Sequence, residues 1–204
     1  MDLVIVRHGE PVRIESGTTG GAPADPELTT RGHDQAQRVA SWLAHEQFDA
    51  LLVSPKRRAI ETAQPIAQRL GLTPIVDDEL IEYDRNADHY IPIEELRANK
   101  DPRFADMVAG RWDNLGGEAP EEFRGRMDAA LSRIINDYAG QRVVAVCHGG
   151  VANLMLALAA GLERHLWFEP AYTSISRIVA SRNGVRSVVS INETGHLVGE
   201  RHRP

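Results

Sequence analysis

The stretch Leu3-Val4-Ile5-Val6-Arg7-His8-Gly9-Glu10 joins a short apolar run directly to a histidine and a glycine. Residues 143–150, Val-Val-Ala-Val-Cys-His-Gly-Gly, repeat this arrangement far along the chain. Short runs of branched apolar residues closed by glycine predict buried β-strands. Open α/β sheets bind ligands in crevices at the carboxyl ends of their strands. We therefore expect His8 and His148 to lie together in one such crevice.

Strand-like and helix-like segments alternate along the rest of the chain. This alternation predicts a mainly parallel sheet with helices on both faces, a three-layer α/β/α sandwich. Asn183-Gly184 favours a tight turn, so the last two strands would form an antiparallel hairpin at one edge. The expected strands cover residues 3–6, 48–53, 74–76, 143–147, 175–180 and 185–191, and the expected helices cover 30–46, 55–70, 121–138 and 150–160.

Residues 80–117 interrupt this alternation. The segment is polar, is punctuated by Pro92 and Pro102, and contains Tyr83, Tyr90 and Trp112. We interpret it as a lid-like insertion over the sheet. A chain of 204 residues is long enough for one substantial core and short for two, so we expect a single domain over residues 1–204.

Composition narrows the possible classes of protein. Contents of 42% hydrophobic and 25% charged residues are ordinary for a globular protein, and a net charge of -6 does not favour nucleic acid as a partner. The sequence predicts neither a signal peptide nor a membrane span, so we expect a cytoplasmic location and no membrane partner. The single cysteine, Cys147, rules out an internal disulfide, and the histidines lack metal-binding spacings. We expect no metal and no cofactor.

Arginine and histidine beside a glycine suit attack on phosphorus. A neutral imidazole such as that of His8 is a nucleophile without prior deprotonation, and Arg7 can hold phosphoryl oxygens. Gly9 would let the backbone turn close to the anion. The structural alternative is a strand-end histidine bonded to backbone, and this short stretch alone leaves both interpretations open.

Two further segments supply candidates of the same kind. In residues 54–63, which open a helix after a strand, Arg58 would be a second phosphate clamp and the helix start an anion site. The alternative for Arg58 is a solvated helix residue, which is the expectation for Arg57. His148 can bond a phosphoryl oxygen, with the N–H groups of Gly149 and Gly150 as added donors. Buried, inert packing is the expectation for Cys147.

Several motifs resemble the histidine phosphatase superfamily, also called the phosphoglycerate mutase-like family. The resemblance runs in family order from Leu3 to about Leu156, and it implies a phosphoglycerate mutase-like fold. It also implies a phosphohistidine intermediate on His8, with Arg7, Arg58 and His148 around the phosphoryl group. The residues that carry it are Arg7-His8-Gly9-Glu10, Leu28-Thr29 with Gly32 and Gln35-Ala36, residues 54–63, Gly117-Glu118 and Cys147-His148-Gly149-Gly150.

The resemblance also implies a carboxylic general acid after the third strand. The spacing Leu-x-Glu in residues 80–82 indicates Glu82, with Glu79 as its competitor. Family members often carry Trp-Glu-Gly shortly afterwards, whereas this chain has Tyr-Asp-Arg-Asn-Ala-Asp over residues 83–88. Many members also place asparagine where this chain has Ile14. These departures put the contacts to the leaving group in doubt.

The function that the resemblance implies is a metal-independent phosphomonoester hydrolase. The length of residues 80–117 suggests a cover over the site, which favours a small phosphorylated metabolite as the substrate. The alternatives are a mutase-type phosphotransferase, a phosphoprotein phosphatase, and a non-catalytic phosphate-binding scaffold. Leu166-Trp167-Phe168 is either a packing cluster or part of a homodimer contact. A surface or packed position is favoured over the mouth of the pocket for Arg13, Tyr83, Arg85, His89, Tyr90 and Trp112.

Overall fold

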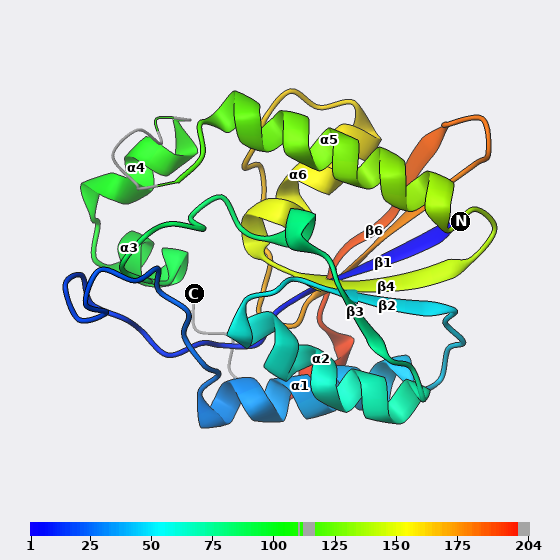
Figure 1. The fold of residues 1–204 in the computed structure, drawn as a ribbon, viewed down its shortest axis with the longest axis horizontal. Coiled ribbons are helices and arrows are strands. Elements are labelled where there is room, and N and C mark those ends of the chain that lie inside the picture. Colours follow the sequence, from blue (N-terminus) through cyan, green and yellow to red (C-terminus); the bar gives the residue numbers. More distant parts are fainter. Residues whose placement is uncertain (110, 112–116, 200–204) are drawn as a thin grey trace.

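A six-stranded sheet forms the centre of the computed structural model, which describes residues 1–109, 111 and 117–199 (Figure 1). The strand order is β3-β2-β4-β1-β5-β6. The first four of these strands are parallel, and β5 and β6 form an antiparallel edge. The strands are β1 (Asp2–Arg7), β2 (Ala50–Val53), β3 (Pro74–Val76), β4 (Arg142–Cys147), β5 (Ile175–Ala180) and β6 (Arg186–Glu193).

Helices cover both faces of the sheet. In Figure 1, α5 and α6 lie on one face and α1 and α2 on the other. Consecutive residues of β1 point to opposite faces, so Leu3 packs in the core under α5 and α6, whereas Val4 packs in the core over α1 and α2. The predicted α/β/α sandwich is confirmed. The helices are α1 (Thr30–Leu43), α2 (Arg57–Leu70), α3 (Ile93–Ala98), α4 (Pro102–Val108), α5 (Pro120–Asp137) and α6 (Gly149–Ala160), with short 3-10 helices η1 (Asp78–Leu80) and η2 (Gly195–Leu197).

Two short helices, α3 and α4, lie within the segment that we expected to be a lid-like insertion. Both begin at a proline: Pro92 directly precedes α3, and Pro102 stands in the first turn of α4. The carboxylate of Asp101 caps α4 by accepting the N–H of Arg103 at 2.9 Å. These prolines therefore mark helix starts, where a missing N–H costs nothing. In Figure 1, α3 and α4 lie beyond the carboxyl ends of the parallel strands.

The pairing of β1 with β4 sets the geometry of the site. Arg7 is aligned with Cys147 in the parallel register, and the N–H of His8 donates to the carbonyl of Cys147 at 2.9 Å. The residues that follow the two strands, His8 and His148, are thus neighbours despite the 140 positions between them. Cys147 itself is buried in the core, as predicted.

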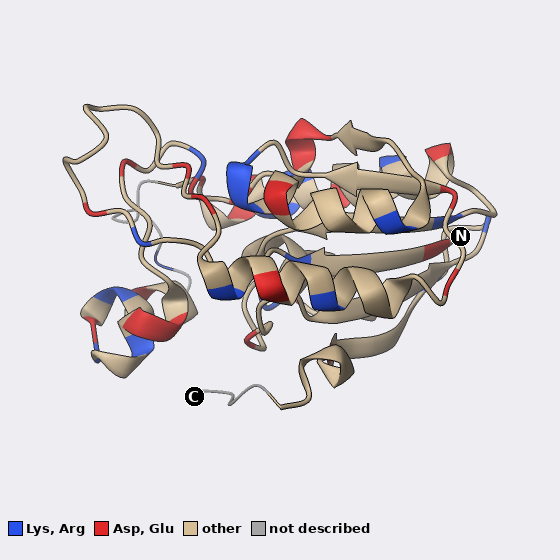
Figure 2. Ribbon diagram, turned by 90° about the horizontal axis from the view of Figure 1, so that it is seen from below, with Lys and Arg blue, Asp and Glu red and all other residues tan. Residues whose placement is uncertain are grey.

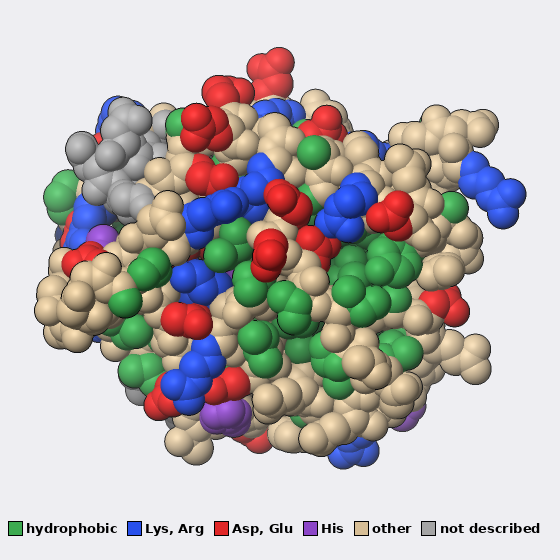
Figure 3. Space-filling model, in the orientation of Figure 1, with side chains coloured by type: hydrophobic (Ala, Val, Ile, Leu, Met, Phe, Trp, Pro, Cys, Tyr) green, Lys and Arg blue, Asp and Glu red, His purple; other side chains and the backbone are tan. Residues whose placement is uncertain are grey.

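The surface combines mixed charge with exposed hydrophobic residues at a sheet edge. Acidic and basic residues are interspersed over the elements seen in Figure 2. Hydrophobic side chains show over the β3 edge in Figure 3, where Ile75 and Val76 are exposed. Within the described ranges, no helix is both long and apolar enough to span a bilayer.

Candidate active site

His8 lies immediately after β1 and is almost completely buried. Its Nδ1 is 2.7 Å from the carbonyl oxygen of Gly9, a contact that requires Nδ1 to carry the proton. The lone pair is therefore on Nε2. Burial first, and then the cationic Arg58 and Arg7, lower the pKa of His8 well below its ordinary value. The ring is consequently neutral near pH 7, as a nucleophile must be.

Gly9 is required for a reason other than the one expected. Its φ is not in the left-handed region. A Cβ at this position would lie 2.6 Å from the carbonyl oxygen of Gly32, in the first turn of α1. Gly9 therefore allows close contact between the loop after β1 and α1.

Arg58 is a buried cation beside His8. Its Nε donates to His8 Nε2 at 3.3 Å, and its guanidinium lies over the ring of Tyr90, 4.6 Å from the centroid. The preceding residue, Arg57, is exposed, as expected. Its N–H donates to the carboxylate of Asp25 at 2.8 Å. One N–H group at the start of α2 is thus bonded to a carboxylate of the chain itself, and α2 contributes the Arg58 side chain to the cavity.

Arg7 approaches from the end of β1. Its Nη1 donates to the carbonyl oxygen of Pro170 at 2.5 Å and to Glu94 Oε1 at 2.7 Å. The guanidinium lies over the ring of Tyr172, 4.0 Å from the centroid. These contacts fix its plane and tie it to α3, the helix that carries Glu94.

His148 stands at the start of α6 and is fully buried. Its ring centroid is 5.1 Å from that of His8, and its Nε2 is 2.6 Å from Ser54 Oγ. Burial, followed by the charge of Arg58, lowers the pKa of His148 well below its ordinary value. When the Ser54 hydroxyl donates to Nε2, the neutral ring carries its proton on Nδ1.

Three buried donors around His8 lack a hydrogen-bond partner among the described residues: Arg7 Nε, Arg58 Nη2 and His148 Nδ1. Leaving such groups unpaired in a protein interior costs about 1–3 kcal/mol each. Three together indicate a site built for the oxygens of an anion. Of the two backbone donors expected here, Gly149 lines the cavity, but the N–H of Gly150 is already bonded to Glu82.

Glu82 lies in the same cavity and is buried, whereas Glu79, its competitor in the sequence, is exposed. The Glu82 carboxyl accepts the N–H of Gly150 at 2.8 Å and that of Tyr83 at 3.2 Å. Burial, with a smaller contribution from the charge of Asp84, raises the pKa of Glu82 to about 7. The group therefore exchanges its proton near neutrality.

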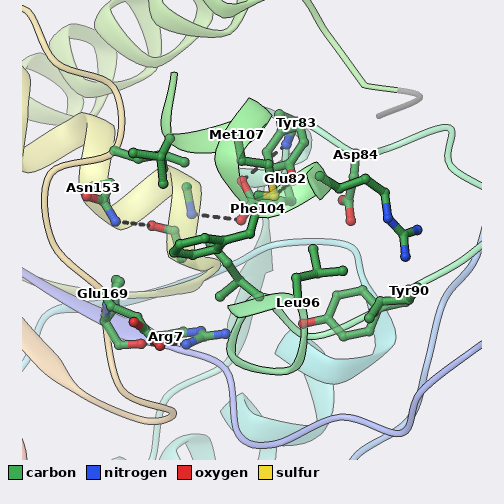
Figure 4. Close-up of a pocket in the computed structure, with 18 of the residues that line it drawn as sticks. Arg7, Glu82, Tyr83, Asp84, Tyr90, Leu96, Phe104, Met107, Asn153 and Glu169 are labelled. Atoms are coloured by element: carbon green, nitrogen blue, oxygen red, sulfur yellow. Dashed lines mark hydrogen bonds between the residues drawn. The ribbon is translucent and has the colours of Figure 1, made fainter. Parts of the chain in front are cut away.

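The cavity above these residues has a volume of about 340 Å³ (Figure 4). Its lining includes the segment 166–168, which sequence reasoning interpreted as packing or a dimer contact, and Phe104 and Met107 of α4, which it missed. The sequence signal for this part of the cavity was the run of three large apolar residues, 166–168, in the loop after α6. His89 and Tyr90 also line the cavity, so the surface or packed position favoured for them was wrong. Tyr83 lines the cavity and also packs against the core, beside Phe123. Arg13 and Arg85 are not among the lining residues, and Trp112 lies outside the described residues.

The described part of the chain has no cluster of three or more His, Cys, Asp or Glu side chains placed to hold a metal ion. The groups that the site itself offers for chemistry are the imidazoles, guanidinium groups and carboxyl described above.

Comparison with known proteins identifies the family. The model of the histidine phosphatase superfamily (branch 1) matches residues 3–194, and the chain belongs to this superfamily. A bifunctional protein of Mycobacterium tuberculosis is 32% identical over 206 aligned residues, covering 96% of this chain and 54% of that protein. The chain thus spans about half the length of that relative.

Two further proteins are similar over nearly their whole length. Phosphoserine phosphatase 1 of Hydrogenobacter thermophilus is 28% identical over 198 residues, covering 96% of this chain and 93% of that protein. The structure of mycobacterial glucosyl-3-phosphoglycerate phosphatase in complex with VO3 matches with a TM-score of 0.77 at 22% identity, covering 95% of this chain and 99% of that one. The structural likeness establishes the fold.

Proposed function

We propose that this protein is a phosphomonoester hydrolase that acts through a phosphohistidine intermediate on His8. The observation that carries the proposal is that three buried donors without a hydrogen-bond partner in the described part of the chain surround a neutral histidine whose lone pair is on Nε2. An anion held by these donors presents its central atom to that nitrogen. Membership of the histidine phosphatase superfamily and similarity to a relative named phosphoserine phosphatase support the same reaction.

In the first step, His8 Nε2 attacks phosphorus and the ester P–O bond breaks. Arg7, Arg58 and His148 donate to the phosphoryl oxygens as their charge redistributes. Arg7, His8, Arg58 and Gly149 line what we call the phosphate end of the cavity. Glu82 gives its proton to the departing oxygen, so the leaving group departs as a neutral alcohol.

In the second step, water attacks the phosphorus of phospho-His8. The Glu82 carboxylate takes a proton from that water, the P–N bond breaks, and inorganic phosphate leaves. Neutral His8 and protonated Glu82 are restored. The near-neutral pKa of Glu82 suits both halves of this cycle, because the group must act first as an acid and then as a base.

A phosphorylated small molecule is the proposed substrate, and the protein requires no metal or cofactor in this proposal. A phosphoprotein phosphatase would use the same chemistry in a more open pocket. A mutase would return the phosphoryl group to a second hydroxyl. The cytoplasmic location, the homodimer, the absence of a nucleic-acid partner and the single-domain organisation stay predictions.

Labelling of the protein with a phosphoryl donor tests the proposal. We expect alkali-stable label on His8, release of inorganic phosphate as the product, and loss of both in His8→Ala. His45→Ala, at an exposed position, is the matched control and should keep full activity. Full turnover by His8→Ala would refute the proposal, and transfer of the label to a second acceptor in place of water would favour the mutase.

A further inference from the structure

The cavity has two chemically distinct ends. One is the phosphate end described above. The other, which we call the apolar chamber, is built from α3, α4 and the loop that follows α6. In Figure 4, the side chains of Leu96, Phe104 and Met107 surround the space beside the polar groups. The residues of the apolar chamber are Leu96, Phe104, Met107, Leu166, Trp167 and Phe168.

Polar side chains beside the apolar chamber are already bonded within the protein. Arg103 makes two hydrogen bonds to the carboxylate of Asp101, at 2.9 and 2.7 Å. Glu169 pairs with Arg97 of α3. These groups line or flank the cavity, but their bonding capacity is directed toward one another and away from a ligand.

Asn153 serves the apolar chamber itself. Its side-chain oxygen accepts the N–H groups of Trp167 and Phe168, and its Nδ2 donates to the carbonyl oxygen of Phe168. The amide thus holds the loop so that its aromatic residues face the cavity. Its hydrogen bonds are used for positioning the loop, so it adds little polarity to the chamber.

Charge in the cavity disfavours an anionic leaving group. Beyond the phosphate end, Asp84 and Glu169 line the cavity and would disfavour a carboxylate there. Within the described chain, Arg164 is the lining cation outside the phosphate end that has no ion pair, and it is exposed at the rim. A buried carboxylate on the substrate would need a closer cation than this.

We infer that the apolar chamber binds the leaving group, and that the preferred substrates are phosphomonoesters of apolar aliphatic or aromatic alcohols. This inference rests on the proposed function, since it takes the phosphate end as the place of the phosphoryl group. Burial of the apolar leaving group in the chamber removes it from water, which adds binding free energy to that of the phosphate contacts.

Hydrolysis of a series of n-alkyl phosphates, from ethyl to octyl, tests the inference. These esters share nearly the same leaving-group chemistry, so chain length changes binding and little else. We expect kcat/KM to rise about two- to fourfold per methylene group until the chamber is filled. Octyl phosphate should exceed 3-phosphoglycerate and phosphoserine by more than tenfold.

Variants distinguish the apolar chamber from a general preference for apolar solutes. Phe104→Ala should reduce the octyl-to-ethyl ratio of kcat/KM by about tenfold or more. Phe48→Ala is the matched control, because Phe48 is equally half-buried but packs in the other core, beside α1 and α2. It should leave the ratio unchanged. Arg164→Gln should also leave it unchanged.

Two results would overturn the inference. One is a flat dependence on chain length. The other is a preference for phosphoserine or 3-phosphoglycerate that Arg164→Gln removes, since this would place an anionic leaving group at the rim. Calorimetric binding of n-alkylphosphonates separates the inference from the proposed function. If the affinity for n-alkylphosphonates rises with chain length but the protein hydrolyses no phosphate ester, the proposed hydrolase is wrong and the proposed role of the apolar chamber stands.

Discussion

His8 and Glu82 line the same cavity, and burial shifts their proton equilibria in opposite directions. Burial disfavours the charged form of each group, so the pKa of the imidazole falls and that of the carboxyl rises to about 7. Arg58 and Arg7 lower the imidazole pKa further, and Asp84 raises the carboxyl pKa further. Near pH 7, a neutral base and a protonated acid therefore coexist, which is the pair of states that the first step requires.

This pair predicts the pH dependence of kcat/KM in the free enzyme. Above pH of about 7, Glu82 loses its proton and the rate should fall roughly tenfold per pH unit. On the acid side, protonation of His8 should limit the rate only well below pH 6.5. The rate of alkyl phosphate hydrolysis, measured from pH 4 to 9, checks both limbs. If the fall in rate above pH 7 persists in Glu82→Gln, a group other than Glu82 causes it.

Gly150 leaves room for the Glu82 carboxyl, and its substitution by alanine tests this role. A Cβ at this position would lie 2.4 Å from Glu82 Oε1, too close for the carboxyl to stay in place. We expect Gly150→Ala to lower kcat for alkyl phosphates about 100-fold, within the range that general acid catalysis contributes. The effect should be much smaller for 4-nitrophenyl phosphate, whose leaving oxygen needs no proton.

Gly125→Ala is the matched control for this substitution. Gly125 lies inside α5, and a Cβ there meets nothing within 4 Å. Alanine at such a helix position should stabilise the protein by about 0.5–1 kcal/mol without changing kcat. Equal losses of activity in both variants would show that Gly150 acts through general stability and not through Glu82.

At the scale of elements, the sheet and its covering helices could be predicted because their signals are local. Branched apolar runs, caps and glycine stops lie within each segment, and the observed bounds differ by only a few residues. Motifs at strand ends likewise indicated Arg7, His8 and His148. The apolar chamber could not be predicted, because Phe104 and Trp167 become neighbours of one cavity only through tertiary packing. Neither α4 nor the loop around Trp167 is long enough for a periodic pattern.

Helix α3 reaches the phosphate end through Glu94, an element contact that no sequence motif indicated. Burial alone would raise the pKa of Glu94, but Arg7 outweighs it and the pKa is lowered, so the carboxylate is charged at neutral pH. Its second oxygen accepts the hydroxyl of Tyr172 at 3.2 Å. A phosphate must therefore share Arg7 with a resident anion.

Removal of that anion should strengthen phosphate binding. We expect Glu94→Gln to lower the inhibition constants of inorganic phosphate and vanadate by about tenfold, because a nearby negative charge is lost from a partly desolvated site. Glu95→Gln is the matched control, since Glu95 pairs with Arg13 outside the cavity. Weaker inhibition in Glu94→Gln would instead show that Glu94 chiefly holds Arg7 in position.

At the scale of the whole molecule, the site exists only in the folded chain. The register of β1 and β4 brings His8 to His148, α2 supplies Arg58, and the segment after η1 supplies Glu82. Groups from four distant parts of the sequence are thus buried together at the carboxyl edge of the sheet. Such burial of charge is costly for folding, so the pH dependence of global stability reports on the site.

Glu82 makes that cost measurable. Because its pKa is about 7 in the folded state and 4.5 ordinarily, the folded chain binds a proton that the unfolded chain releases between these values. Stability should fall as the pH rises from 4.5 to 7, by on the order of 3 kcal/mol. Glu82→Gln keeps an acceptor for the N–H of Gly150 but cannot ionise, so its free energy of unfolding should exceed that of the unsubstituted protein by this amount at pH 8. The gain should vanish below pH 4.5.

Urea unfolding at pH 4.5, 6 and 8 measures the difference directly. Glu79→Gln is the matched control: Glu79 is exposed, and its substitution should change stability by less than about 0.5 kcal/mol at every pH. A Glu82→Gln variant that is less stable than the unsubstituted protein at pH 8 would mean that the carboxylate is stabilised there when charged. In that case Glu82 could not supply the proton to the leaving group near neutrality, and the acid would have to be sought elsewhere in the cavity, with Asp84 as the next carboxyl along its lining.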